Sequence, residues 1–150
     1  MSLWPIAELL PHSGNMVLLD EVLEFSADTV RTRLCVRPGG LFNQADGSLP
    51  AWLAIELMAQ SVAAFAGCHA RQAGLPVKLG FLLGTRSFSC NVERFPLGCE
   101  LQIEAHCSLQ DDSGMGVFEC RLSGAQILAE ARLNVFCPAE TGSYLKEPEV

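Results

Sequence analysis

The sequence predicts an α+β domain in which a curved antiparallel sheet of about six strands wraps around one long central helix. Two observations lead to this prediction. Residues 49–67 are apolar almost throughout, whereas the segments after residue 98 alternate apolar and polar residues with the period of a strand. A chain of 150 residues is also of single-domain length, so one domain is expected over residues 1–150.

Signals for the ends of the central helix flank residues 49–67. Ser48 stands where an N-cap is expected, and Pro50 falls in the first turn, where a missing N–H costs little. Gly67 stands where a left-handed residue often ends a helix. Because nearly every side chain between these signals is apolar, we expect the helix to be buried on all sides.

Glu56 and Gln60 interrupt this apolar helix and lie on one face, because they are spaced i, i+4. A carboxyl group on an apolar helix is a candidate for acid–base chemistry. The alternative is a structural carboxylate paired with a buried donor such as Gln60 or an arginine.

The remaining segments predict strands. A strand with apolar residues on both faces is expected at 16–25, and the later ones are expected at 29–36, 78–90, 99–109, 116–123 and 126–137. Glycines at positions 80 and 84 indicate a bend or bulge. Residues 139–150 lack periodicity and are expected to be a loose tail. Strands wrapped around one helix in this way make a hot-dog fold, whose open edge usually pairs with a second subunit.

Composition excludes several classes of function. The net charge of −7 argues against a nucleic-acid binder. Glu56 and Gln60 within the apolar stretch favour a soluble core helix over a membrane span. The seven cysteines form no CxxC pair, which favours free thiols in a reducing cytoplasm. No ligands occur at zinc spacing and no phosphate-binding loop is present, so neither a metal nor a cofactor is expected.

Two motifs resemble the bacterial 3-hydroxyacyl-[acyl-carrier-protein] dehydratases. Residues 10–22, LPHSGNMVLLDEV, are similar to the family's opening LPHR-x-P-x-LLVDRV. Residues 50–60, PAWLAIELMAQ, are similar to its central-helix motif PG-x(4)-EAMAQ. Residues 84–88 and 116–120 fit two later strands. The resemblance runs from residue 9 to residue 138 and looks closest to dehydratase-like hot-dog proteins of aryl polyene gene clusters.

This resemblance implies that a 3-hydroxyacyl thioester, carried on the phosphopantetheine of an acyl carrier protein, loses water to give the trans-2-enoyl thioester. Glu56 corresponds to the acid that protonates the departing hydroxyl. The N–H of Ala51, at the helix start, is expected to bind the thioester oxygen as the enolate forms. Gln60 is expected to support Glu56 or the neighbouring loop.

The usual catalytic base is missing. In the family, a histidine in a GHFP loop before the helix removes the α-proton, but counting back from Glu56 places Phe42 there, and residues 41–46 contain no histidine. Phe42 is expected to contact the substrate instead. His12 matches a motif position and is predicted to approach the partner subunit's Glu56, although a turn histidine that bonds the backbone is an equal alternative. Asp46 is a weaker candidate base, because an exposed aspartate is not very basic.

Three functions therefore stay open. The first is the dehydratase, which is expected to form a homodimer or a heterodimer with another hot-dog subunit. The second is a non-catalytic hot-dog subunit that pairs with an active dehydratase. The third is a hot-dog acyl thioesterase in which Glu56 activates water. The scattered basic residues form either a docking rim for an acidic carrier protein or ordinary solvated charges: Arg71, Lys78, Arg86 and Arg94.

Overall fold

The computed structural model describes residues 4–77 and 80–137, so the predicted tail at 139–150 lies outside the described residues. Short 3-10 helices at Ile6–Glu8 and Gly14–Met16 precede β1 (Glu21–Phe25) and β2 (Thr29–Cys35). The chain continues through β3 (Leu49–Pro50), a 3-10 turn (Ala51–Leu53), α1 (Ala54–Gln72), β4 (Phe81–Cys90), β5 (Arg94–Phe95), β6 (Glu100–Gln110), β7 (Met115–Gly124) and β8 (Ile127–Phe136).

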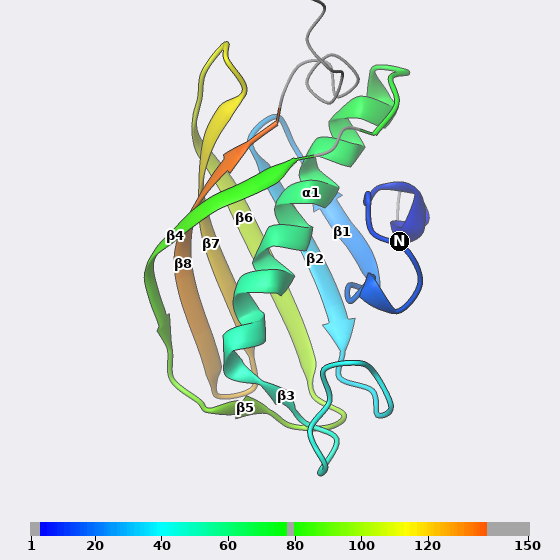
Figure 1. Ribbon diagram of the computed structural model, residues 1–150, viewed down its shortest axis with the longest axis vertical. Coiled ribbons are helices and arrows are strands. Elements are labelled where there is room, and N and C mark those ends of the chain that lie inside the picture. Colours follow the sequence, from blue (N-terminus) through cyan, green and yellow to red (C-terminus); the bar gives the residue numbers. More distant parts are fainter. Residues whose placement is uncertain (1–3, 78–79, 138–150) are drawn as a thin grey trace, which may run out of the picture.

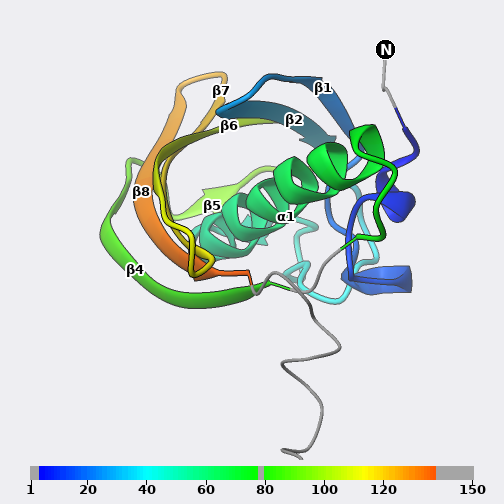
Figure 2. The same ribbon diagram turned by 90° about the horizontal axis from the view of Figure 1, so that it is seen from above.

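Six strands form one antiparallel sheet in the order β1-β2-β6-β7-β8-β4, and β3 pairs with β5 separately. The sheet runs behind α1 in Figure 1 and curves around it when seen from above in Figure 2. The core lies between them and includes Leu57 and Met58 of α1 and Leu101, Ile103 and Leu122 of the sheet, all 0% exposed. The predicted α+β hot-dog arrangement is confirmed.

The helix extends beyond Gly67 to Gln72, so the prediction that Gly67 ends it is wrong. Gly67 serves a close approach instead, because a Cβ at this position would overlap the backbone carbonyl of Leu9. The N-terminal prediction also fails: the hydroxyl of Ser48 donates to Gln44 and Asp46 and does not cap the helix. A contact between distant segments decides the role of Gly67, whereas Ser48 hydrogen-bonds within its own loop.

One face of α1 is open in the single chain, contrary to the prediction of burial on all sides. Eleven of its 19 residues are buried, whereas Glu56, Ala59, Ala63 and Ala66 along one face are only partly covered. The apolar segment Ala51–Gln72 has the length and composition of a membrane-crossing helix, and 61% of its most apolar part is buried. A buried core helix of a soluble protein has the same length and composition.

The segment predicted as a strand from residue 16 is strand only from Glu21 onward. Residues Gly14–Met16 form a 3-10 turn, and the N–H of Leu18 donates to the side chain of Gln60 and not to a neighbouring strand. This irregular stretch lies against α1, which explains why it is apolar without being part of the sheet.

Two cysteines in the core are predicted to resist alkylation. Burial raises the pKa of Cys120 to about 12 and that of Cys68 to about 11, so almost no thiolate exists at pH 8. With iodoacetamide at pH 8, the partly exposed cysteines such as Cys35 and Cys90 should react first, whereas Cys68 and Cys120 should react only after denaturation. Mass spectrometry of tryptic peptides measures the order, and early labelling of Cys120 would contradict the packing described above.

Candidate active site

His12 and Glu56 lie together within one chain. The Nε2 atom of His12 is 3.4 Å from Oε1 of Glu56, and the two side chains are 26% and 35% exposed. His12 belongs to the turn before Gly14–Met16, and Glu56 lies in the first turn of α1. The structure thus brings His12 to Glu56 of its own chain, whereas the sequence analysis expected His12 to approach Glu56 of the partner subunit.

Gln60 fixes the N-terminal segment against the helix and contacts the carboxylate. Its Oε1 accepts from the N–H of Leu18 at 2.9 Å, and its Nε2 donates to the carbonyl of Met16 at 2.6 Å. The same Nε2 lies 3.2 Å from Oε1 of Glu56. Since a backbone N–H can only donate and a carbonyl can only accept, these partners determine the orientation of the amide. Gln60 is thus a positioning residue for the N-terminal segment and the Glu56 carboxylate.

Replacing Gln60 with leucine should destabilise the protein by about 2–3 kcal/mol, because a buried amide loses its hydrogen bonds and leaves backbone partners unsatisfied. Turnover should also fall, since His12 would no longer be held near Glu56. Urea unfolding measures the first effect. Gln102→Leu, on the exposed face of β6, is the matched control and should change stability by less than about 0.5 kcal/mol. Equal stability of the two variants would contradict the positioning role.

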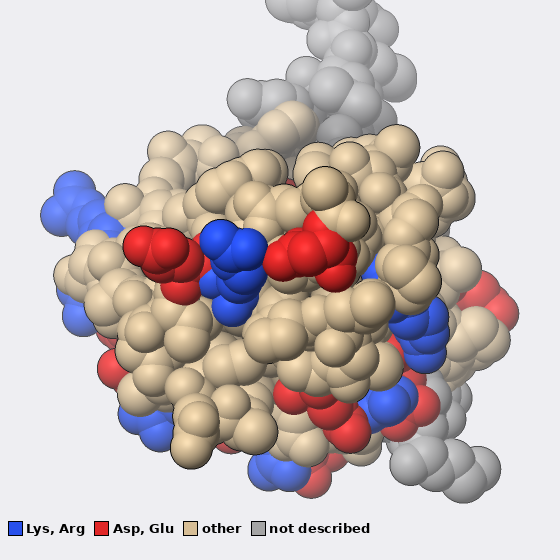
Figure 3. Space-filling model, turned by 90° about the horizontal axis from the view of Figure 1, so that it is seen from below, with Lys and Arg blue, Asp and Glu red and all other residues tan. Residues whose placement is uncertain are grey.

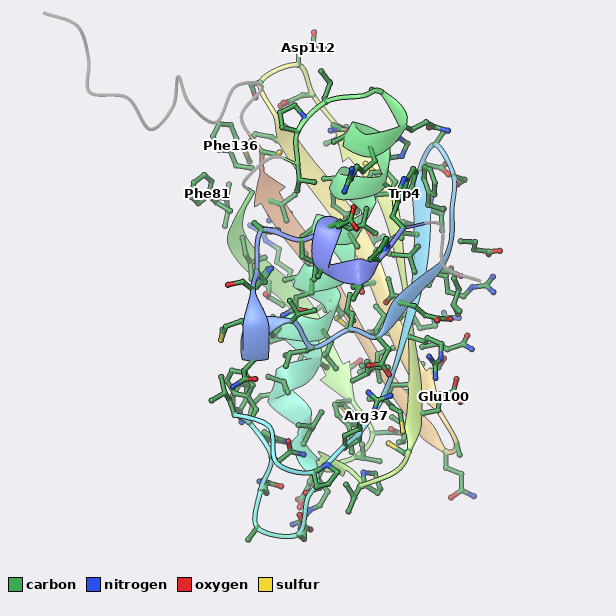
Figure 4. All side chains as sticks on the ribbon, turned by 90° about the vertical axis from the view of Figure 1, so that its right-hand side faces the viewer. Trp4, Arg37, Phe81, Glu100, Asp112 and Phe136 are labelled. Carbon is green, nitrogen blue, oxygen red and sulfur yellow. The ribbon has the colours of Figure 1, made fainter. Side chains whose placement is uncertain are left out.

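A cavity of about 190 Å³ opens beside the His12–Glu56 pair. Small side chains of α1 form one wall, and Phe81 of β4 and Phe136 of β8 form another. These two phenylalanines are opposite each other in the strand pairing and lie close together in Figure 4. Sequence reasoning missed both, because their positions at strand ends carried no motif. The site is therefore one acid–base pair on the wall of an otherwise apolar cavity.

Two predicted substrate-binding residues are engaged elsewhere. The N–H of Ala51 donates to the carbonyl of Glu93 at 3.0 Å, which removes it as the free donor expected for a thioester oxygen. Phe42 packs edge-on against Trp52, with ring centroids 6.4 Å apart, and is not among the residues that line the cavity. Position 42 therefore contributes packing at the start of the helix.

Asp46 is poorly placed to act as a base. Its carboxylate accepts from the hydroxyl and the N–H of Ser48 and pairs with Arg94 at 3.1 Å. The Ser48 hydrogen bonds, with a smaller contribution from Arg94, lower the pKa of Asp46 to about 2. A carboxylate that is ionised and weakly basic in this way stabilises its loop and removes few protons.

The other two histidines lie away from Glu56. His69 contacts the carbonyl of Ser26 at 2.9 Å, and His106 on the outer face of the sheet contacts Thr29. In the described part of the chain, no three histidine, cysteine or acidic side chains are grouped as a metal site would require.

Two of the four basic residues considered as a docking rim form ion pairs with acidic side chains. Arg71 pairs with Glu8, Arg94 pairs with Asp46, and Lys78 lies outside the described residues. Arg86 lies opposite Arg132 in the pairing of β4 with β8. On the face shown in Figure 3, basic and acidic side chains are intermixed in a largely uncharged surface. Docking of an acidic carrier protein stays a prediction.

Comparison with known proteins places this chain in a family. Residues 4–146 match the ApeP-like family, described as ApeP dehydratase. The chain belongs to the ApeP-like dehydratase family. This family belongs to aryl polyene biosynthesis, in agreement with the resemblance found in the two motifs. A comparison with curated proteins gave no match.

Solved structures agree with the ApeP-like assignment. The dehydratase heterocomplex ApeI:P from Xenorhabdus doucetiae contains a chain with 36% identity and a TM-score of 0.85, over 94% of this chain and 95% of that one. Cj0977 from Campylobacter jejuni has 15% identity and a TM-score of 0.62, over 93% and 91% of the two chains. A hypothetical thioesterase from Streptococcus pneumoniae TIGR4 has 13% identity and a TM-score of 0.57, over 78% and 86%. The last two likenesses show the fold alone.

Proposed function

We propose that this member of the ApeP-like family is itself a dehydratase that acts on 3-hydroxyacyl thioesters bound to an acyl carrier protein. The observation that supports this most is the contact between His12 and Glu56 on the wall of one cavity. An imidazole and a carboxyl group side by side can supply the base and the acid that elimination of water needs.

In the proposed reaction, Nε2 of His12 takes the proton from the α-carbon, and the electron pair moves toward the thioester carbonyl. The pair then forms the double bond between the α- and β-carbons while the bond from the β-carbon to oxygen breaks. Protonated Glu56 gives its proton to the departing hydroxyl, which leaves as water. The 3.4 Å contact lets the proton on His12 return to Glu56 and restores both groups.

The Nδ1 atom of His12 matters to this scheme. It is buried and has no hydrogen-bond partner among the described residues. With Nε2 as the base, the neutral ring already carries its hydrogen on Nδ1, so Nδ1 needs an acceptor before and after His12 takes the proton. We propose that the substrate or a second subunit supplies it.

A second hot-dog subunit fits two surfaces of this chain. β4 is an edge strand with exposed Leu82, Leu83 and Phe88, and the face of α1 that carries Glu56 is only partly covered. Apolar edge strands favour pairing with another chain. The similarity to a chain of the ApeI:P heterocomplex supports a heterodimer, although a homodimer would cover the same surfaces.

The second candidate function is a non-catalytic subunit of such a dimer. Residues 41–46 lack the loop histidine, and Asp46 is engaged with Ser48 and Arg94. In this case the partner would supply the reacting groups. We favour the catalytic proposal because His12 occupies the place beside Glu56 within the same chain.

All seven cysteines lie within the described residues, and none forms a disulfide there. Free thiols are typical of reducing compartments, which supports the proposal that the protein works in the cytoplasm.

His12→Ala should lower turnover of carrier-bound 3-hydroxyacyl chains by about 100-fold, because general-base catalysis is typically worth that much. The assay follows the enoyl product by mass spectrometry, for the chain alone and mixed with its hot-dog partner. His106→Ala, on the exposed outer face of β6, is the matched control and should retain activity. Equal turnover in wild type and His12→Ala would contradict the assignment of the base.

A further inference from the structure

The two edges of the six-stranded sheet differ in chemistry. β1, at one edge, carries Glu21 and Glu24, and charged side chains on an edge strand discourage pairing with another chain. Figure 2 shows β4 at the other end of the curved sheet, where the exposed apolar side chains are Leu82, Leu83 and Phe88. Unpaired backbone groups beside apolar side chains favour the addition of a strand, so β4 is the edge that is suited to pair.

Charges on the outer face of the sheet are matched from strand to strand. Each of the four arginines on β2, β7 and β8 forms an ion pair with a glutamate on an adjacent strand. These pairs are Arg31 with Glu24 and Glu104, Arg33 with Glu21 and Glu100, Arg121 with Glu130, and Arg132 with Glu119. Opposite charges across neighbouring strands stabilise their pairing, whereas like charges directly opposite destabilise it. An arginine on one strand therefore favours a glutamate or aspartate on the next.

Arg86 is the exception, and it lies on the edge strand. The residue opposite Arg86 on β8 is Arg132, and directly opposite side chains point to the same face of a sheet. The glutamates of β7 and β8 are already engaged, Glu119 with Arg132 and Glu130 with Arg121. Among the residues that the structure describes, Arg86 has no ion-pair partner. Its charge therefore lies unmatched beside the position that a strand added to β4 would occupy.

A second copy of this chain is a poor match for that position. In a two-fold symmetric dimer the same segment of each subunit meets its copy, so two antiparallel β4 strands would pair around their middles. Arg86 lies near the middle of Phe81–Cys90. The two Arg86 side chains would then be opposite or diagonal to each other, with their Cβ atoms roughly 5–8 Å apart. Their repulsion opposes self-pairing, although the apolar side chains of β4 favour it.

We propose that β4 pairs with an edge strand of a different hot-dog subunit, which carries an acidic side chain beside Arg86. The apolar residues of β4 supply the attraction. Arg86 selects the partner, because its charge is matched in the mixed pair and opposed in a pair of two copies. This inference rests on the second subunit of the proposed function and gives its edge strand a chemical identity. It does not rest on the roles of His12 and Glu56 in the reaction.

The test uses Arg86→Glu as the acidic partner, because this variant presents a glutamate from the same strand. Wild type, the variant and their equimolar mixture are compared by sedimentation velocity in about 50 mM sodium chloride, where charges are weakly screened. The mixture should form a dimer about tenfold more tightly than either chain alone, since each chain alone meets its own charge. Native mass spectrometry checks that the dimer holds one copy of each chain. In about 1 M salt this advantage should disappear.

A second variant tests the repulsion directly. Arg86→Leu should pair with itself about tenfold more tightly than wild type does, because the repulsion is gone. Gln102→Glu and Gln102→Leu, on the exposed outer face of β6 and away from both edges, are the matched controls and should leave association unchanged.

The outcomes of these measurements are separable from those of the activity assay. A wild-type dimer as tight as that of Arg86→Leu would overturn the role of Arg86 in selecting the partner. A mixture of wild type and Arg86→Glu that associates no more than its components would overturn the acidic partner strand. Wild-type turnover in Glu56→Gln would overturn the proposed function, whereas an association that follows the charge at position 86 would still support this inference.

Discussion

Glu56→Gln should lower the dehydration rate by about 1,000-fold while the protein stays folded. General-acid catalysis is typically worth 10²- to 10⁴-fold, and an amide of the same shape cannot give up a proton to the departing hydroxyl. The substituted side chain keeps an oxygen that can accept from Gln60, which now donates to Glu56 at 3.2 Å. The enoyl product is followed by mass spectrometry of the carrier protein, and the melting temperature is measured by circular dichroism.

Glu130→Gln is the matched control, because Glu130 lies on the outer face of β8 and pairs with Arg121. It should leave turnover unchanged. Wild-type turnover in Glu56→Gln, both alone and with the hot-dog partner, would contradict the proposed mechanism. A different pair of results would show that the chain is a non-catalytic subunit. In that case the wild-type chain is inactive alone, and its complex with the hot-dog partner keeps full turnover when it carries Glu56→Gln.

Gly67→Ala should have the largest effect on stability, a loss of about 3 kcal/mol. An added Cβ would overlap the carbonyl of Leu9, which is backbone and cannot move aside as a flexible side chain would. The N-terminal segment would have to lift from the helix, although alanine is itself the better helix former. Urea unfolding followed by circular dichroism measures the loss.

Gly84→Ala is the control for this change. A Cβ at Gly84 meets nothing within 4 Å, and its backbone is not left-handed, so stability should change by less than about 0.5 kcal/mol. If Gly67→Ala were as stable as Gly84→Ala, the close packing of Leu9 against α1 would be wrong. Because Leu9 lies only three residues before His12, Gly67→Ala should also lower activity.

Alternation in the sequence predicted the strands of the sheet well. Leu101, Ile103 and Ala105 of β6 are 0% exposed and alternate with exposed neighbours, as the pattern indicated. The pattern works because one face of this sheet packs on α1 and the other meets solvent. Leu109 continues the same alternation but is 62% exposed, because the pairing with β7 shifts register between Cys107 and Leu109. Such a shift has no signal in residue type.

The sequence indicated which residue types form the site, but it did not indicate how they are arranged in space. Glu56 was singled out because a carboxyl group on an apolar helix is unusual, and Gln60 because of its spacing. The sequence could not show that His12 reaches Glu56 of its own chain, since this depends on how the segment before β1 lies on the helix. The engagement of the Ala51 N–H by Glu93 likewise depends on the pairing of β3 with β5.

The attachment of His12 has a consequence for how activity can change in such a protein. The candidate base sits on a segment outside the sheet, joined to the helix by Gln60 and the contact at Gly67. The six strands and α1 would pack in the same way whatever residue stands at position 12. The proposed catalytic role and the fold are therefore separable in this chain: a substitution at position 12 would remove the proposed base and leave a binding subunit without rebuilding the core.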